Sequence, residues 1–372
     1  MKKEKVAVLV SCSNHYNNRI KFIEENLKAK NYKIIYIVAD FNHFTKEYYE
    51  PKEANVIIHV PRYKKNISIS RIVSYFVFSK KLFQEVKKIK PNLIYALIPP
   101  NFIAHYMAKY KKLENTKLVF DIFDMWPEAY INKSKILMPL FNIWRNLRNK
   151  NLNKADIVIT ECNYFKNVLN NQIKISTETL YLTKEETNTI KENLLQEKIN
   201  ICYLGSINNI IDIDKTVAIL SKINKIKPVI FNIIGHGEKQ EELITKCQRE
   251  NIEVNYLGKI YENEKKQEIF NQCDFGINIL KEDLVIGLSM KAIDYLEGGL
   301  PIITNIQEDL GKLIQKYKAG YVINSEDDVN EILKLSKQDI GKQKENAYIL
   351  FQDVFSIKKF NNNLNEILKK IQ

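Results

Sequence analysis

Short apolar runs rich in β-branched residues alternate with longer segments of helical periodicity along most of the sequence. Continuous apolar strands separated by helices are typical of a parallel sheet covered on both faces. In the first half, strands are expected at Val6–Val10, Lys33–Ala39, Val56–Val60, Leu93–Leu97, Leu118–Phe123 and Ile157–Thr160. In the second half they are expected at Ile199–Leu204, Val229–Ile234, Val254–Leu257, Phe275–Ile279, Pro301–Thr304 and Tyr321–Ile323. The pattern predicts an α/β chain with doubly wound parallel sheets.

Two successive α/β series predict two Rossmann-like domains, which agrees with a length of 372 residues. The polar segment 183–198 predicts a linker between a first domain at 1–182 and a second at 199–354. Residues 355–372 carry apolar side chains near helical spacing and predict a last helix that packs back on the first domain. Ligands of open α/β sheets bind beyond the carboxyl ends of the strands, so we expect a cleft between the two domains.

The net charge of +13 favours anionic partners. Only six of the 57 basic residues are Arg, which disfavours specific recognition of nucleic acid. The five cysteines form no C-x-x-C pair, so we expect a reducing compartment and no structural zinc. No apolar run reaches the length of a spanning helix. These features predict a cytoplasmic protein with peripheral contact to the inner face of the plasma membrane.

Two segments mix apolar and basic residues at helical spacing, namely 138–150 and Ile72–Lys88. Helices of this kind can lie in the headgroup region of an anionic bilayer. The alternative for each is ordinary core packing with a solvated basic face.

The turn after the first strand, residues 11–19, contains no glycine. The dinucleotide-binding fingerprint G-x-G-x-x-G is absent there, and the P-loop pattern is absent from the chain. This disfavours an NAD enzyme and a P-loop NTPase. His15 and Arg19 are candidate acceptor-binding residues, and the alternative is a polar turn that leads into a helix.

Asp124 and Trp126 follow the strand expected at Leu118–Phe123. At the carboxyl end of a strand, a carboxylate can accept hydrogen bonds from sugar hydroxyls, and an indole ring can cover the apolar face of a sugar. The sequence therefore predicts Asp124 as a catalytic residue and Trp126 as an acceptor-binding residue. The alternative is a turn with a capping aspartate and a packing tryptophan.

Small-residue turns follow two strands of the second half, at Gly205-Ser206 and at Gly235 and Gly237. Glycine at such a turn lets the backbone approach a phosphate closely. The strongest segment is 286–304, where a small-residue turn opens a short helix at Ser289 and Met290. Free N–H groups at a helix start favour a diphosphate. Lys291 can add a positive charge there, and Asp294, one turn further, can accept the hydroxyls of a ribose.

The run GLSMKAIDYLEGGLPIIT resembles the donor-site signature of the GT-B fold glycosyltransferases of family 4. FDIFDMWPEAY resembles the D-x-W-P segment of bacterial members that build surface polysaccharides, and KADIVITECNYFKNVL resembles a strand and helix of the family. The resemblance implies two domains facing across a cleft, with a UDP-, GDP- or dTDP-sugar donor and a lipid-linked or glycan acceptor. It also implies retention of anomeric configuration, with neither metal nor cofactor.

Residue by residue, Asp294 falls at the second acidic position of the family's E-x7-E motif, and Ile286 stands at the first. Gly205 and Ser206 match the turn that contacts the diphosphate, but the usual Arg and Lys after it are absent. Lys291 is expected to supply that charge, with Lys259 as a further donor-site residue. Glu282 or Asp283 is a candidate substitute for the lost carboxylate.

These departures leave two alternatives to a transferase. One is a non-catalytic GT-B subunit that binds a partner enzyme or the membrane. The other is an epimerase that acts on free nucleotide-sugars.

Overall fold

The computed structural model describes residues 4–13, 17–129, 138–186 and 197–371. The chain divides into two compact units, each with its own sheet and core. The first comprises residues 1–182 together with 360–372, and the second comprises residues 183–359. Most of the predicted linker, residues 187–196, lies outside the described part of the chain.

The sheet of the first unit has seven parallel strands in the order β3-β2-β1-β4-β5-β6-β7. Strand order reverses at β1, as in a doubly wound fold. The strands are β1 (Lys5–Ser11), β2 (Tyr32–Ala39), β3 (Val56–Ile58), β4 (Leu93–Ile98), β5 (Lys117–Ile122), β6 (Ile157–Thr160) and β7 (Thr177–Thr179). The edge strand β7, with the sequence TET, was not expected, because three polar residues carry no apolar signal.

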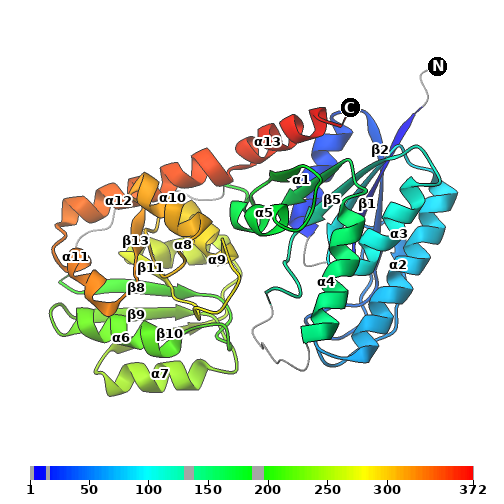
Figure 1. Cartoon of the computed structure of the whole chain (residues 1–372). Coiled ribbons are helices and arrows are strands. Elements are labelled where there is room, and N and C mark those ends of the chain that lie inside the picture. Colours follow the sequence, from blue (N-terminus) through cyan, green and yellow to red (C-terminus); the bar gives the residue numbers. More distant parts are fainter. Residues whose placement is uncertain (1–3, 14–16, 130–137, 187–196, 372) are drawn as a thin grey trace. The chain divides into compact units, whose positions relative to one another are not determined.

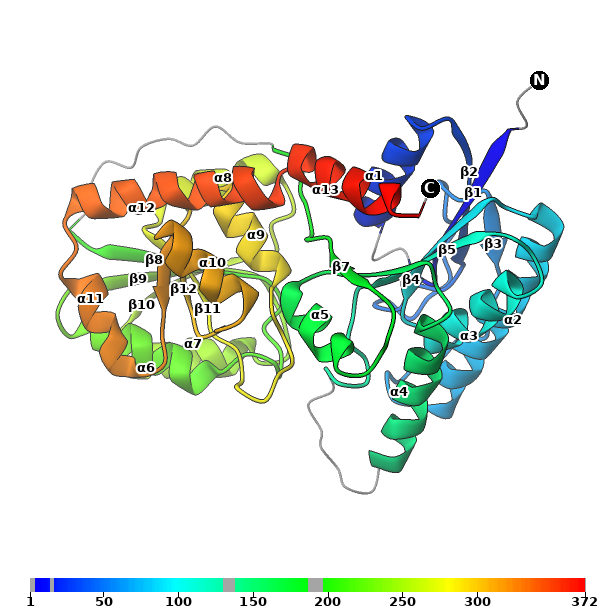
Figure 2. The ribbon, with the colours of Figure 1, turned by 45° about the horizontal axis from the view of Figure 1, so that its top comes forward.

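Six helices accompany this sheet in the described residues: α1 (Asn17–Lys28), α2 (Ile69–Ile89), α3 (Asn101–Lys111), α4 (Met138–Leu152), α5 (Asn163–Asn170) and α13 (Ile357–Lys369). Helices α2, α3 and α4 lie side by side (Figures 1 and 2). The rings of Phe76, Phe102 and Trp144 link them in that order, with centroids 5.5 and 4.9 Å apart. On α13, Phe360 packs edge-on against Phe22 of α1, with ring centroids 6.0 Å apart.

The sheet of the second unit has six parallel strands in the order β10-β9-β8-β11-β12-β13. They are β8 (Ile199–Leu204), β9 (Val229–Ile234), β10 (Glu253–Gly258), β11 (Phe275–Asn278), β12 (Ile302–Thr304) and β13 (Gly320–Val322). The predicted α/β fold with two doubly wound parallel sheets is therefore confirmed. In the core of the second unit, isoleucines of β8, β9 and β11 pack against α6 and α7.

The helices of the second unit are α6 (Ile213–Asn224), α7 (Gln240–Arg249), α8 (Asn263–Gln272), α9 (Met290–Glu297), α10 (Asp309–Tyr317), α11 (Asn330–Leu333) and α12 (Lys337–Leu350). A π-helical turn, Phe351–Phe355, extends α12. The last two helices were not expected, because α12 is polar on most of its surface and buries only Ala347 and Leu350.

Gly276 of β11 lies under the ring of Tyr295, and a Cβ at this position would be 2.7 Å from the ring carbon Cγ. The ring cannot easily move, because the Tyr295 hydroxyl accepts from the N–H of Leu204 at 2.7 Å and donates to the carbonyl oxygen of Cys202 at 3.2 Å. The strand therefore requires glycine here for close packing.

We predict that Gly276→Ala lowers the free energy of unfolding by about 1–3 kcal/mol, the usual cost of overpacking a core. Gly341→Ala is the matched control, since Gly341 lies exposed in α12 with no atom within 4 Å of an added Cβ. It should raise stability by about 0.5–1 kcal/mol, because alanine is the better helix former. Urea unfolding of both variants checks the pair, and equal effects would contradict the packing argument.

Candidate functional site

Two turns at the carboxyl edge of the second sheet lie backbone against backbone. A Cβ at Gly235 would lie 1.9 Å from the carbonyl oxygen of Gly205, and one at Gly237 would lie 2.1 Å from that of Ile207. Gly205 has φ +116° and Gly235 has φ +154°, conformations that disfavour other residues. These glycines are therefore required for packing of the two turns, whatever ligand the turns hold.

The Lys291 ammonium lies over the first of these turns. A Cβ at Gly205 would be 3.7 Å from Lys291 Nζ, so the structure brings together two residues that the sequence nominated separately. Nζ donates a hydrogen bond to the Tyr203 hydroxyl at 3.0 Å and lies 4.2 Å from the centre of the Tyr203 ring. The Tyr203 hydroxyl in turn donates to the main-chain oxygen of Ser206 at 2.8 Å. Tyr203 thus holds both the cation and the turn.

Burial lowers the pKa of Lys291 to about 7. Among the described residues, no carboxylate forms an ion pair with this ammonium. A desolvated cation without a counter-ion favours an anionic ligand, because the ligand's charge stabilises the protonated form. The Lys291 ammonium therefore favours binding of an anion near neutral pH.

Helix α9 begins next to Lys291 without a side-chain cap. Its N-cap residue, Ser289, is buried, and its hydroxyl accepts a hydrogen bond from Asn278 Nδ2 at 2.7 Å. The first residue, Met290, is 52% exposed. Because the Ser289 hydroxyl does not cap the helix, the first-turn N–H groups keep the positive end of the helix dipole available to a ligand.

Asp294 has a partner that the sequence did not indicate. Its Oδ1 lies 2.7 Å from Lys184 Nζ and 3.9 Å from Lys266 Nζ. Lys184 also pairs with the buried Glu297 at 3.1 Å. The two carboxylates raise the pKa of Lys184 against the opposing effect of its burial. The Asp294 carboxylate is therefore already bound to a cation.

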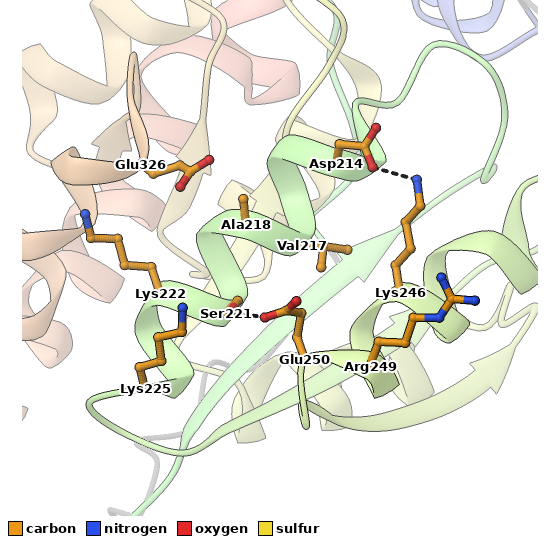
Figure 3. A pocket seen from close by; sticks show the side chains of 10 residues that line it. All are labelled: Asp214, Val217, Ala218, Ser221, Lys222, Lys225, Lys246, Arg249, Glu250 and Glu326. Carbon is orange, nitrogen blue, oxygen red and sulfur yellow. Dashed lines mark hydrogen bonds and ion pairs between the residues drawn. The ribbon is translucent and has the colours of Figure 1, made fainter.

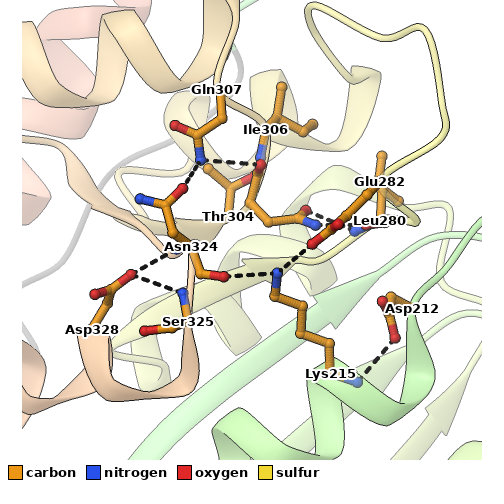
Figure 4. Close-up of polar contacts among 11 residues, drawn as sticks. Asp212, Lys215, Leu280, Glu282, Thr304, Ile306, Gln307, Asn324, Ser325 and Asp328 are labelled. Carbon is orange, nitrogen blue, oxygen red and sulfur yellow. Dashed lines mark hydrogen bonds and ion pairs between the residues drawn. The ribbon is translucent and has the colours of Figure 1, made fainter.

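The remaining donor-site candidates lie at the same edge of the sheet. Lys259 is exposed directly after β10, and Ser206 is exposed after β8. Glu282 is also exposed, and its carboxylate pairs with Lys215 Nζ at 3.0 Å (Figure 4). The same ammonium donates to the main-chain oxygen of Asn324 at 3.1 Å, so Glu282 and Lys215 join loops at the ends of β11 and β13.

A groove between α6 and α7 lies apart from these residues (Figure 3). It is crossed by an ion pair of Lys246 with Asp214 at 2.6 Å and by a hydrogen bond from Ser221 to Glu250 at 2.6 Å. Its lining residues are Asp214, Val217, Ala218, Ser221, Lys222, Lys225, Lys246, Arg249, Glu250 and Glu326. None of the predicted site residues lines it. Among the described residues, no cluster of three metal-ligating side chains occurs in either unit.

In the first unit, Asp124 lies just beyond the end of β5, half-buried at the carboxyl edge of the sheet. Burial raises the pKa of Asp124, and the charges of Arg71 and Arg148 oppose that effect. The ring of Trp126 lies 5.8 Å from the Arg71 guanidinium and 5.3 Å from the Trp144 ring. The structure thus gathers Asp124, Trp126 and Arg71 at one edge, and Arg71 was not expected from the sequence.

The backbone at Trp126 is held by a buried ion pair. Arg148 Nη2 and Nη1 contact the two carboxylate oxygens of Glu128 at 2.7 and 3.0 Å. Nη1 also donates to the main-chain oxygen of Trp126 at 3.2 Å. Arg148 lies in segment 138–150, for which the sequence left membrane contact and core packing as alternatives; it is fully buried and fixes this turn.

Arg19 is buried, and its guanidinium is bound by groups of the first unit itself. Its Nε and Nη2 contact both carboxylate oxygens of Asp121 at 2.7 and 3.0 Å, and Nη2 also donates to the Leu180 carbonyl at 3.0 Å. The Tyr95 hydroxyl donates to the same carboxylate at 2.6 Å. Only 5% of Arg19 is exposed, so its position suits the joining of β4, β5 and α1 better than ligand contact. His15 lies outside the described residues.

Known proteins resemble the chain in sequence over one segment and in fold throughout. The family model described as "Glycosyl transferases group 1" matches residues 198–337. No curated protein sequence matches significantly. The structure of sucrose-phosphate synthase from Thermosynechococcus elongatus is similar with a TM-score of 0.74 and 12% identity, over 99% of each chain.

Two further solved structures are similar over almost their whole length. Anabaena Alr3699/HepE in complex with UDP and glucose has a TM-score of 0.68 and 12% identity, over 98% of this chain and 99% of that one. The lipopolysaccharide outer core galactosyltransferase WaaB, in its apo form, has a TM-score of 0.69 and 13% identity, over 99% and 100%. The fold and the matched segment agree with the resemblance seen in the sequence. The whole chain therefore has the GT-B fold, and residues 198–337 form a domain of the group 1 glycosyltransferases.

Proposed function

We propose that the chain moves a sugar from a nucleotide diphosphate sugar to a lipid-linked glycan in surface polysaccharide synthesis, with retention of anomeric configuration as in family 4. The observation that carries this proposal is the Lys291 ammonium, held over Gly205 beside the uncapped start of α9. The HepE structure contains UDP and glucose, and WaaB is a galactosyltransferase of lipopolysaccharide, which supports such a donor and such a pathway.

The chemical demand of the reaction is the departure of a nucleotide diphosphate. Lys291 and the N–H groups at Ser289 and Met290 would stabilise the charge that develops on the leaving phosphate, in a site that excludes part of the solvent. Gly205, Ser206, Gly235, Gly237 and Lys259 would line the diphosphate and the base. Asp294 would accept hydrogen bonds from the ribose while it shares its charge with Lys184.

The acceptor would bind at the first unit. Asp124 would accept hydrogen bonds from sugar hydroxyls near the transferred group, since burial of a carboxyl strengthens its hydrogen bonds. The half-buried ring of Trp126 would cover a sugar face. Trp126 is positioned by two contacts, namely the Arg148–Glu128 pair at its main-chain oxygen and the Trp144 ring beside its indole.

A surface suited to lipid lies on α2. Ile69, Ile72, Val73 and Phe76 follow helical spacing and would normally be buried, yet they are 80, 42, 46 and 41% exposed. On α4, Leu140 and Ile143 are 61 and 66% exposed. We call the four exposed residues of α2 the apolar stripe.

The charge around the apolar stripe is basic. Residues 54–84 contain six Lys or Arg and no acidic residue, and α4 contains no acidic residue either. An exposed apolar stripe with a basic surround fits an anionic bilayer surface. No helix in the described ranges is long and apolar enough to cross a membrane. The stripe therefore supports peripheral contact, with the acceptor presented in the lipid.

We predict that Lys291→Ala abolishes most sugar transfer and weakens donor binding about tenfold or more, because it removes the charge beside the diphosphate. Thermal shift with UDP-, GDP- and dTDP-sugars would first identify the donor, since a ligand raises the melting temperature by mass action. Wild-type affinity for that donor should fall as pH rises above about 7, where Lys291 loses its proton. Lys312→Ala, which removes an exposed lysine of α10, is the control.

An unchanged turnover and donor affinity in Lys291→Ala would contradict the donor-site assignment. Interconversion of free nucleotide-sugars by the chain without acceptor, seen by chromatography, would instead favour an epimerase.

We predict that Lys291→Met stabilises the folded chain most below about pH 7. The pKa of Lys291 falls from 10.5 to about 7 on folding, so the unfolded chain binds more protons between these values and wild-type stability rises with pH there. The methionine variant lacks this cost, and its advantage should shrink between pH 7 and 10. Urea unfolding at both ends of this range checks the sign. An advantage that grew with pH would show that Lys291 is not desolvated.

We predict that Ile72→Ser combined with Phe76→Ser weakens binding to vesicles of phosphatidylcholine and phosphatidylglycerol about tenfold or more, because two apolar side chains leave the lipid. The control combines Ile226→Ser with Tyr261→Ser, which removes two apolar groups from the second unit that are even more exposed, at 67 and 79%. Co-sedimentation measures both. Equal binding of the stripe variant and the wild type would rule out this surface as the lipid contact.

A further inference from the structure

Two cations in the first unit meet without a carboxylate between them. Arg71 Nη1 donates to the main-chain oxygen of Asn66 at 2.7 Å, and Lys46 Nζ donates to the Asn66 side-chain oxygen at 2.6 Å. Both also lie against the Tyr63 ring, with the ammonium 4.9 Å and the guanidinium carbon 5.9 Å from its centre. Asn66 and Tyr63 thus hold Lys46 and Arg71, hereafter the cation pair, in one cluster.

In the described part of the chain, the cation pair has one carboxylate close to it but none in contact, since the charge of Arg71 acts on the half-buried Asp124. Neither side chain forms an ion pair with a carboxylate there, although both are half-buried. Burial lowers the pKa of Lys46, and the charge of Arg71 lowers it further, as expected for two cations close together. Two cations held together and partly desolvated are stabilised by an anion from outside.

The cation pair lies beside the proposed acceptor site. The Arg71 guanidinium is 5.8 Å from the Trp126 ring, and its charge acts on the carboxyl of Asp124. Arg71 belongs to the first turn of α2 and donates through Nε to the Tyr75 hydroxyl at 2.8 Å, on the core-facing side of the helix. The exposed residues Ile67 and Ile69 lie within one turn of it, where the apolar stripe begins.

We propose that Lys46 and Arg71 bind the phosphate or diphosphate that joins the lipid to the acceptor saccharide. The inference rests on the proposed function, and it adds the acceptor's anionic group as a recognised feature. The planar guanidinium suits two phosphate oxygens at once, whereas the ammonium acts as a point charge. An acceptor anchored in this way would have its lipid near the start of α2 and its sugar near Trp126 and Asp124.

The experiment uses the full chain with farnesyl diphosphate, farnesol and sodium pyrophosphate as separate probes. Trp126 and Trp144 are the chain's two tryptophans and contact each other, so their fluorescence reports on this edge of the first unit. Farnesyl diphosphate should give a saturable change and farnesol should not. Pyrophosphate should compete with farnesyl diphosphate. Saturable binding of farnesol with equal affinity would overturn the anion site.

Lys46→Gln and Arg71→Gln should each weaken farnesyl diphosphate binding about tenfold, and Arg71→Lys should weaken it less, since it retains the charge. Lys80→Gln makes the same charge change at an exposed position of α2. Its affinity for farnesyl diphosphate should stay within about twofold of that of the wild type. Circular dichroism confirms that each variant folds. Wild-type affinity in both Lys46→Gln and Arg71→Gln, or an equal loss in Lys80→Gln, would overturn the proposal.

Two further measurements separate the sources of phosphate. Binding to phosphatidylglycerol vesicles should fall no further in Arg71→Gln than in Lys80→Gln, since each removes one charge from the same basic surround, and a loss as large as that for farnesyl diphosphate would assign the pair to lipid headgroups. UDP-sugar binding should also be unchanged, and a selective loss would assign the pair to the donor. Persistent farnesyl diphosphate binding in a chain that transfers no sugar would refute the proposed function alone.

Discussion

Parallel pairing of every strand puts all the carboxyl ends of a sheet at one edge, and each candidate residue in this chain depends on that constraint. Gly205 and Gly235 follow neighbouring strands of the second sheet, and Asp124 follows a central strand of the first. The turns between strand and helix carry polar side chains because they are not covered by the core. Polar and charged residues can therefore lie together at these edges without disturbing the packing of either sheet.

The sequence predicted the features that depend on position along a strand, and it failed where two side chains meet from distant elements. The sheets, the glycine turns and the placement of Lys291 near Gly205 depend on strand ends and could be anticipated. Tyr203, which orients Lys291 from inside β8, looked like an ordinary core residue. Asp294 was recognised by its motif, but its pairing with Lys184 joins residues 110 positions apart.

The burial of Arg19 was missed for the same reason, because it depends on a residue far away in the sequence. A polar residue at the start of a helix is normally exposed, and nothing local indicates that Asp121, inside a buried strand, would hold it. A buried arginine and aspartate must satisfy each other, because either one alone would leave an uncompensated charge. The sequence correctly predicted that α2 is amphipathic, but only the structure distinguishes the exposed residues of its apolar stripe from the buried Phe78, Leu82 and Val86.

The chain's last helix has a consequence for biosynthesis. Residues 360–372 complete the first unit, where Phe360 covers Phe22 and lies against the Arg19 guanidinium. A ribosome makes these residues only after the whole second unit has been translated. The nascent first unit must therefore wait with part of α1 uncovered until the second unit has been made.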